Sequence, residues 1–284
     1  MSKIALVTDS TAYIPKEYLE RYGITVTPQV LIWGHDTYRD GVDIQPDEFY
    51  KRLKTTKVMP TTSQVSVMDM HNIFSRLLEQ GYEVLGIFIS SKLSGTLQSA
   101  MQGREELAKG KGKIEILDSN TTAMSMGFQV LSVARAAAEG ASQSECKALA
   151  EKARECTGVY FVVDTLEFLH RGGRIGGAQR FLGTALNLKP ILTIQDGKVE
   201  AVERIRTKGK AVERLIDIIA EQTAGKKPVR LASLHANAVD EAKALLEQAT
   251  RLINPDEVIF TDVSPVVGTH TGPGTVGLAY MVGM

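Results

Sequence analysis

The chain has 284 residues, enough for two domains of ordinary size, and 43% of them are hydrophobic and 23% charged, as in a soluble globular protein. Lysine plus arginine and aspartate plus glutamate each number 33, so the formal net charge of zero argues against nucleic acid as a partner. The two cysteines lack CxxC spacing and no apolar run reaches membrane-spanning length, so we expect a cytoplasmic protein without a disulfide framework, a structural zinc or a transmembrane segment.

Three predicted strands each end in a cluster of hydroxyl and carboxyl side chains that precedes a predicted helix. Residues 3–7 lead into 8–11 and a helix over 15–22, residues 84–89 lead into 90–100, and residues 114–117 lead into 118–122 and an Ala-rich helix ending near Gly140. Free N–H groups beside hydroxyls at a helix start receive phosphate or carboxylate, and open α/β sheets bind ligands beyond the carboxyl ends of their strands. The pattern predicts a site for an anionic head group, although Ser94 also fits the simpler role of a helix N-cap.

The segment 24–64 interrupts this alternation of strands and helices. It carries several turn signals and little helical periodicity, so we expect it to wrap over the first sheet. Its end, residues 60–66, is a second run of polar side chains, which can bind a ligand or simply cap a helix over 66–80. The first 155 residues are therefore predicted to form one domain with 24–64 as a wrapping segment.

Residues 156–284 are predicted to form a second α/β domain. The expected elements are a strand over 158–163, a helix over 166–170, a glycine-rich turn with two arginines over 171–177, a hairpin of 188–194 and 199–206, a helix over 210–224, a strand over 229–235, a helix over 239–251 and a strand over 257–263. The predicted fold class is thus α/β, with a mainly parallel Rossmann-like sheet followed by a mixed α/β domain.

Familiar enzyme motifs give no support for a nucleotide or hydrolase site. Residues 272–277 match GxGxxG, but the chain stops too soon afterwards for a dinucleotide site, and neither a P-loop nor a GxSxG elbow is present. His270 stands out, because residues 268–274 present it with hydroxyls in an expected glycine-rich turn. An alternative function is a small-molecule hydrolase or phosphotransferase, with Asp9 or His270 as general base and Ser10 or Ser94 as nucleophile.

These segments together resemble the DegV family, bacterial fatty-acid-binding proteins that carry the substrate of fatty acid kinase. The resemblance lies in six motifs that occur in the family's order: residues 8–12, 62–64, 90–96, 166–175, 188–192 and 270–274. It covers nearly the whole chain. It implies a lipid carrier without catalytic activity, cofactor or metal.

The resemblance also implies a binding site. Thr62 and Ser94 would contact the carboxylate of a long-chain fatty acid, and Ser63, Gly95, Thr96 and His270 would line that end; we call these six residues the polar cluster. The expected cluster carries no arginine or lysine, which would hold the carboxylate tightly and compete with its phosphorylation.

Two arginines and the acyl chain complete the expectation. By resemblance, Arg171 and Arg206 would meet a kinase subunit or the acyl phosphate, and transient membrane contact is compatible with such a carrier. The second domain would contribute the apolar tunnel from a set of side chains in its first part: Phe161, Leu166, Phe168, Leu169, Phe181, Leu182, Leu186, Leu188, Ile191 and Leu192.

Overall fold

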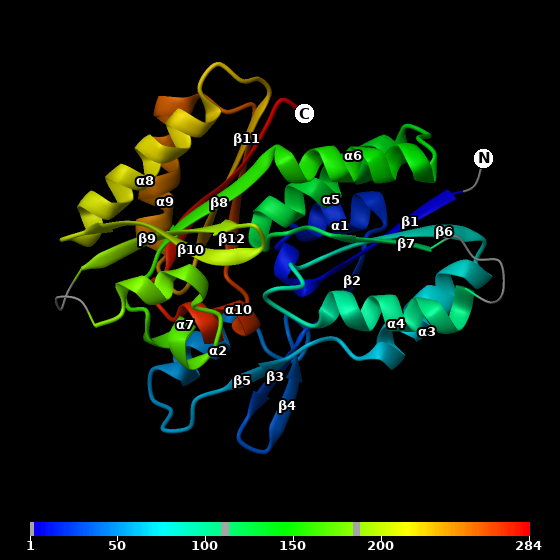
Figure 1. Cartoon of the computed structure of the whole chain (residues 1–284), viewed down its shortest axis with the longest axis horizontal. Helices are drawn as coiled ribbons and strands as arrows, with labels where there is room; N and C mark the ends of the chain where they lie inside the picture. Colours follow the sequence, from blue (N-terminus) through cyan, green and yellow to red (C-terminus); the bar gives the residue numbers. More distant parts are fainter. Residues whose placement is uncertain (1–2, 109–113, 184–187) are drawn as a thin grey trace.

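The first half of the chain builds a parallel sheet with four strands in the order β2-β1-β6-β7 (Figure 1). The structure, a computed structural model, describes residues 3–108, 114–183 and 188–284. The strands are β1 (Lys3–Asp9), β2 (Thr25–Thr27), β6 (Tyr82–Phe88) and β7 (Ile114–Asp118). The last five residues of both β1 and β6 are all buried, as expected of parallel strands covered on both faces.

Alternate residues of these strands face different helix layers. Ala5 and Val7 pack with one hydrophobic cluster, and Leu6 between them packs with another. The first layer consists of α3 (Val67–Glu79) and α4 (Thr96–Ala108), and the second of α5 (Ala123–Ala138) and α6 (Gln143–Glu155), with α1 (Lys16–Tyr22) against α5.

The segment 24–64 leaves the parallel sheet after β2. It forms a small antiparallel sheet in the order β4-β3-β5, from β3 (Val30–Trp33), β4 (Asp36–Arg39) and β5 (Thr61–Ser63), and a helix, α2 (Pro46–Leu53). The expectation that this segment has little helical character was wrong for α2. This helix of eight residues buries Phe49, Tyr50 and Leu53. This sheet and α2 contact α10 (Pro265–Thr271), so the segment extends toward the second half of the chain.

The second half builds a mixed sheet in the order β10-β9-β8-β13-β11-β12, in which only β11 and β12 run parallel. Its strands are β8 (Thr157–Val162), β9 (Lys189–Gln195), β10 (Lys198–Ile205), β11 (Val229–His235), β12 (Glu257–Asp262) and β13 (Val276–Val282). The predicted hairpin is confirmed as β9 and β10. Asp196 and Gly197 both have positive φ, the requirement of a two-residue turn of type I′.

The sequence analysis missed β13, although it lies at the centre of the mixed sheet. All seven of its residues are buried, so they show no polar alternation. The start of β13 overlaps the GxGxxG match, because Gly272 and Gly274 precede the strand and Gly277 lies within it.

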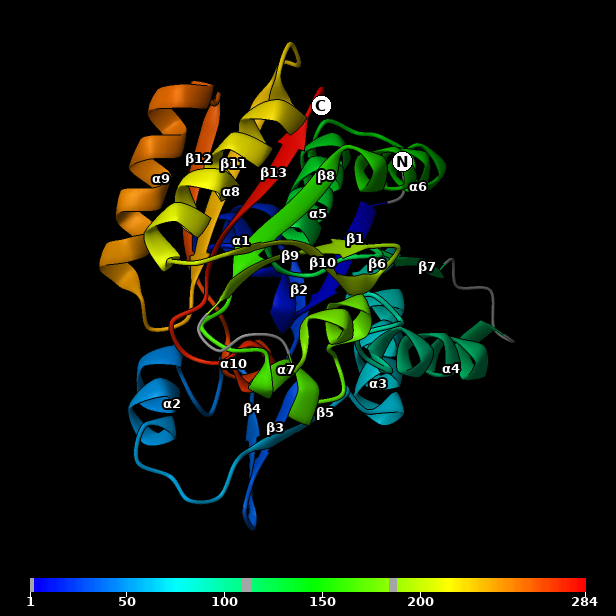
Figure 2. The ribbon, with the colours of Figure 1, turned by 60° about the vertical axis from the view of Figure 1, so that its left-hand side comes forward.

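Helix α5 lies between the two sheets. It contacts β1 and β6 of the parallel sheet and β8, β11 and β13 of the mixed sheet, and every residue from Ala123 to Leu131 is buried. The other face of the mixed sheet is covered by α8 (Lys208–Thr223) and α9 (Val239–Ile253) (Figure 2). The predicted α/β fold with a parallel and a mixed sheet is confirmed.

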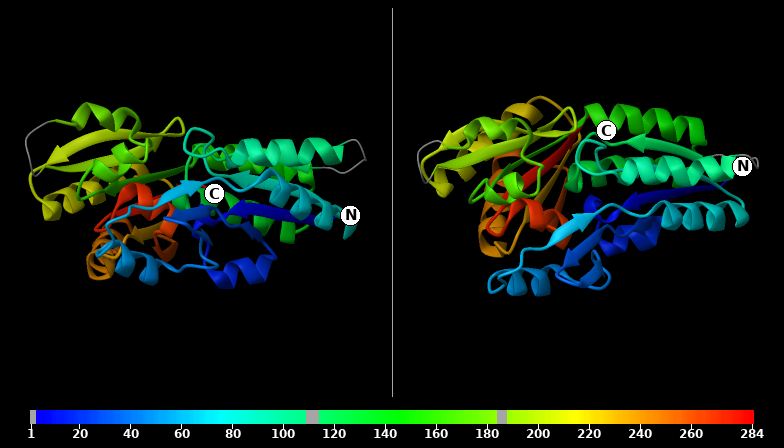
Figure 3. Two further views of the ribbon diagram at one scale, coloured as in Figure 1. Left: turned by 90° about the horizontal axis from the view of Figure 1, so that it is seen from below. Right: turned by 60° about the horizontal axis from the view of Figure 1, so that its bottom comes forward.

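The expected domain boundary falls between the end of α6 and the start of β8, at residues 155–156. Figure 3 shows the N-terminal strand at the end of the molecule away from the α8 and α9 layer. The boundary stays a proposal, because α5 precedes it in the chain and yet packs against both sheets.

Candidate functional site

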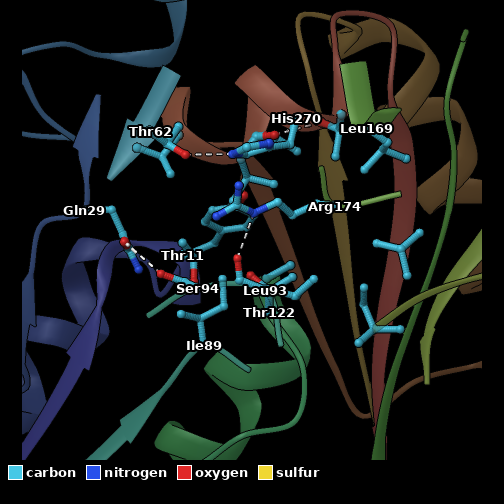
Figure 4. A pocket seen from close by; sticks show the side chains of 18 of the residues that line it. Thr11, Gln29, Thr62, Ile89, Leu93, Ser94, Thr122, Leu169, Arg174 and His270 are labelled. Atoms are coloured by element: carbon cyan, nitrogen blue, oxygen red, sulfur yellow. Dashed lines mark hydrogen bonds between the residues drawn. The ribbon is translucent and has the colours of Figure 1, made fainter. Parts of the chain in front are cut away.

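A cavity of about 180 Å³ lies where the carboxyl ends of the parallel strands meet the mixed sheet (Figure 4). Thr11, Ser94 and Thr122, each following a different strand of the parallel sheet, all line it. Residues from all three polar clusters of the sequence therefore meet at one cavity. Ser63 and Gln64 also line the cavity and are exposed, so the cavity meets solvent beside them.

Thr62 and His270 are joined by a short hydrogen bond across this cavity. The distance from Thr62 Oγ1 to His270 Nε2 is 2.7 Å. Burial, with the nearby Arg174 guanidinium, lowers the pKa of His270 to about 4, so the imidazole is neutral at pH 7. His270 belongs to α10 and not to the expected glycine-rich turn, because Ser264 caps a helix whose first residue is Pro265.

Ser94 takes part in a hydroxyl and amide network with Thr96 and Gln29. Thr96 Oγ1 donates to Gln29 Oε1 at 3.0 Å and lies 3.0 Å from Ser94 Oγ. Ser94 Oγ also accepts from the Thr96 N–H at 3.3 Å, a local turn bond. The N-cap position of α4 is Gly95, whose carbonyl accepts from the Ser99 N–H, so Ser94 lies one residue before it, on the cavity wall. Thr96 is fully buried and does not line the cavity, so it can act only through its neighbours.

Gln29 and Gly95 complete this side of the wall. Gln29 is buried, and its Nε2 has no hydrogen-bond partner in the part of the chain that the structure describes. A Cβ on Gly95 would lie 2.2 Å from Gln64 Oε1, which explains why the position holds glycine. The sequence analysis missed Gln29, which no motif marks.

Arg174 is the one charged side chain on the cavity wall among the described residues. Its Nε donates to Leu93 O at 3.0 Å and its Nη1 to Gly172 O at 2.8 Å, which holds the guanidinium across the cavity (Figure 4). The expectation of a cluster without arginine was therefore wrong. The signal was present in the sequence, because Arg174 is the second arginine of the glycine-rich turn.

Close packing and backbone conformation explain why the two residues before Arg174 are glycines. A Cβ on Gly172 would lie 2.0 Å from His270 Nδ1, and Gly173 has a φ of +69°, a left-handed conformation that glycine adopts readily. Arg171, in α7 (Glu167–Arg171), instead lies outside the cavity lining, is exposed and pairs with Glu167. Arg206 is likewise exposed and outside the cavity.

The opposite side of the cavity is apolar. The mixed sheet supplies five side chains there, namely Val159, Phe161, Ile194, Val199 and Leu234. Of the tunnel residues expected from the sequence, only Phe161 and Leu169 line the cavity, and Leu186 lies outside the described residues. The first half of the chain also contributes, through Ile89 and Leu93.

The size of the cavity suits an extended acyl chain. One water needs about 10–15 Å³ of such volume, so the cavity holds roughly 12 to 18 atoms of that size. A methylene group is close to a water molecule in size. The cavity therefore matches a long acyl chain better than a small metabolite.

The residues of the alternative enzyme are held in other contacts. Asp9 is fully buried, and its carboxylate accepts hydrogen bonds from Thr11 and from the Ile89 N–H, while burial raises its pKa. Ser10 Oγ donates to Asp40 at 2.6 Å. No base-to-nucleophile hydrogen bond joins Asp9 to Ser10 or His270 to Ser94 among the described residues, and His270 Nδ1 lacks an orienting partner there.

Two kinds of feature are absent from the described ranges, 3–108, 114–183 and 188–284. No helix there is both long and apolar enough to cross a membrane. No group of three or more His, Cys, Asp or Glu side chains is placed there to hold a metal ion.

The whole chain is similar to one protein family. Residues 3–282 match the family described as "Uncharacterised protein, DegV family". The chain is also 34% identical over 281 residues to Protein DegV of Bacillus subtilis, with 98% of each chain covered. The chain belongs to the DegV family. A DegV domain-containing protein of Halalkalibacterium halodurans is 35% identical over 285 residues, with 99% of each chain covered.

Solved structures of DegV proteins share this fold, and three of them are described as binding fatty acids. A DegV family protein from Thermus thermophilus, described for its fatty acid binding, superposes with a TM-score of 0.92 at 37% identity and 99% coverage of each chain. DegV of Bacillus subtilis, described as a fatty acid binding protein, gives 0.89 at 32% identity, covering 99% of this chain and all of the other. A stearic acid-binding protein from Eubacterium ventriosum gives 0.91 at 25% identity, covering all of this chain and 99% of the other.

Proposed function

We propose that this DegV protein binds a long-chain fatty acid, with its carboxylate at the polar cluster and its tail against the mixed sheet. The observation that carries the proposal is the division of one cavity into two ends. The polar end consists of Gln29, Thr62, Ser94, Arg174 and His270, and the apolar end of the five side chains from the mixed sheet. Fatty-acid-binding DegV proteins of known structure support the same ligand class.

The hydrogen bonds of the polar end leave donors for a carboxylate. Ser94 Oγ donates to Gln29 Oε1 only at the long distance of 3.5 Å, and an ionised carboxylate is the stronger acceptor, so this proton can turn to a ligand. If His270 carries its proton on Nε2, the imidazole donates to Thr62 and directs the Thr62 hydroxyl proton to the carboxylate. Arg174 adds a positive charge, and Gln29 Nε2 adds a donor that has no partner among the described residues.

The two ends contribute differently to affinity. A tail of about fifteen methylenes at about 0.8 kcal/mol each gives on the order of 12 kcal/mol before the costs of binding. A hydrogen bond to a charged group adds only about 1.5–3 kcal/mol. The tail therefore sets the affinity, and the polar cluster orients the carboxylate.

The proposal includes presentation of the bound acid to a fatty acid kinase in the cytoplasm, without catalysis by this chain. Arg171 and Arg206 are exposed outside the cavity, where a partner subunit can reach them. In this proposal the partner binds the ATP that phosphorylates the carboxylate, and this chain supplies only the bound acid.

Mass spectrometry of an organic extract of the purified full chain tests the ligand class. We expect a long-chain fatty acid in the extract and tight binding of a fluorescent fatty acid after its removal. Absence of both co-purified acid and fluorescent-acid binding would overturn the proposal.

Reconstitution tests the partner. The protein, a fatty acid, ATP and a fatty acid kinase subunit are mixed, each is omitted in turn, and acyl phosphate is measured. We expect product only in the complete mixture, and less of it with Arg171→Ala or Arg206→Ala at unchanged fatty acid affinity. Arg251→Ala is the matched control, because Arg251 also pairs with a glutamate four residues away, on the distant α9. Product formed without the kinase subunit would make this chain an enzyme.

A further inference from the structure

Two hydroxyls on the cavity wall lie outside the polar cluster and have no hydrogen-bond partner. They are Tyr13 Oη and Thr122 Oγ1, both inaccessible to bulk water and unpartnered among the residues that the structure describes. The hydroxyl and the backbone N–H of Ser264 lie close enough to Tyr13 Oη to lower its pKa, but neither meets the distance and angle requirements of a hydrogen bond. Buried hydroxyls nearly always have a partner, so this pair calls for an explanation.

Other threonines of the same wall are satisfied within the protein. Thr271 Oγ1 donates to Val267 O at 3.2 Å, and Thr275 Oγ1 donates to Gly272 O at 2.9 Å. Both hydroxyls are therefore used to stabilise local backbone. Tyr13 and Thr122 differ from them in offering both a donor and an acceptor to whatever fills the cavity.

The two hydroxyls come from elements that pack closely together. Tyr13 follows a short 3₁₀ helix, η1 (Ser10–Ala12), and Thr122 immediately precedes α5. A Cβ on Gly127 of α5 would lie 2.5 Å from Ala12 O, so α5 and η1 are in contact. Both residues therefore line the cavity from elements that meet at the carboxyl end of the parallel sheet.

The backbone at these positions is arranged in an uncommon way. Tyr13 has a φ of +56° and Ala123 a φ of +58°, left-handed conformations that cost energy for residues other than glycine. Thr122 occupies the N-cap position of a helix of 16 residues, yet its side chain makes no capping hydrogen bond, the usual role of threonine there. Burial raises the pKa of Tyr13, so its phenol stays protonated and can both donate and accept.

We propose that Tyr13 and Thr122 form a second polar subsite that recognises a hydroxyl group on the acyl chain, which makes hydroxy fatty acids a preferred ligand class. This inference rests on the proposed fatty acid binding. A saturated tail lying against this region leaves both protein hydroxyls unpaired. A secondary alcohol at the right position donates one hydrogen bond and accepts another, and so satisfies them.

Competition binding tests the subsite. The full chain, freed of lipid, is titrated with a fluorescent fatty acid against stearate and against hydroxystearates that differ in the position of the hydroxyl. We expect one position, or two adjacent ones, to bind about tenfold more tightly than stearate, the gain of one well-placed hydrogen bond.

Isosteric variants assign the gain to the two residues. Tyr13→Phe and Thr122→Val remove hydroxyls that bond to nothing within the protein, so both variants should fold. We expect each to lower the preference for the hydroxylated acid and the double variant to abolish it, with stearate bound at least as tightly as before. Thr271→Val is the matched control, because its hydroxyl is already hydrogen-bonded, and it should keep the preference.

The outcomes separate this inference from the proposed function. Stearate binding with every hydroxystearate equal or weaker would overturn the subsite alone. A hydroxystearate preference that persists in the double variant would also overturn it. Failure of both stearate and hydroxystearates to bind would overturn the subsite together with the proposed function.

Discussion

The two ends of the cavity are built in contrasting ways. The polar end gathers side chains from five places that are far apart in the chain: the residue before β3, the strand β5, the loop before α4, the turn after α7 and the helix α10. The apolar end comes from four strands of one sheet, β8, β9, β10 and β11. Orientation of a head group thus depends on tertiary contacts between distant segments, whereas the space for the tail follows from strand alternation within a single sheet.

A charge placed at the apolar end should have the largest effect. The variant Ile194→Asp places an aspartate carboxylate on the apolar wall, and a bound fatty acid tail would cut it off from water. We therefore expect affinity for a fluorescent fatty acid to fall more than about 100-fold. Val202→Asp is the control, because Val202 is a half-buried residue of the same hairpin that does not line the cavity. Equal affinities of the two variants would show that the tail does not lie against β9.

Removal of a hydroxyl from the polar end should have a smaller effect. We expect Thr62→Val or Ser94→Ala to weaken binding by about tenfold each, the loss of one hydrogen bond to a charged group. The control Thr269→Val removes a hydroxyl of α10 that donates to Pro265 O and lies outside the cavity lining. Unaltered affinity in the double Thr62→Val, Ser94→Ala variant would remove the polar cluster from the proposed site.

The neutral imidazole of His270 should make stability depend on pH. The pKa of His270 is about 4 in the folded protein, below the ordinary 6.5 of a solvated histidine, so the unfolded chain takes up the proton first as the pH falls. The contribution of His270 is complete above pH 6.5 and is lost between pH 6.5 and 4. In urea unfolding over this range, the wild type should lose stability relative to His270→Gln as the pH falls from 6.5 to 4; a constant offset would contradict the prediction.

A single methyl group at the mouth of the cavity should have the smallest effect. Gly95→Ala would push aside the Gln64 amide, the far end of a flexible side chain whose Nε2 donates to Ser99 Oγ at 3.2 Å. We expect a two- to threefold change in fatty acid affinity, about 0.5 kcal/mol. Gly209→Ala, in α8 with open space around it, should leave affinity unchanged. A loss as large as that of Thr62→Val would mean that Gly95 contacts the head group directly.

The same contrast explains what the sequence could predict. Strands ending in hydroxyl clusters follow from local pattern, and the structure brings Thr11, Ser94 and Thr122 to one cavity as expected. The involvement of Gln29 depends on packing between distant segments, and no local pattern reports it. The glycine-rich turn marks Arg174 in the sequence, but only the tertiary contacts show that it faces the cavity. Neither does the exclusion of Thr96 from the wall, because Thr96 and Ser94 look alike in the sequence.

The elements that were missed have local explanations. The strand β13 is buried throughout and lacks the polar alternation that marks an exposed strand. The helix α10 spans only seven residues and contains a glycine at position 268, so it reads as a turn. Most of the expected tunnel residues lie elsewhere in the core, because apolar character alone does not say which side chains face an internal space.

The position of α5 has a consequence for how the molecule unfolds. Its residues Met124, Met126, Phe128 and Leu131 are shielded from water on one side by the parallel sheet and on the other by the mixed sheet. Loss of either sheet would expose this helix and remove the support of the other. Two sheets with separate strand orders are therefore tied into a single cooperative unit, and calorimetry of the ligand-free protein should record one melting transition.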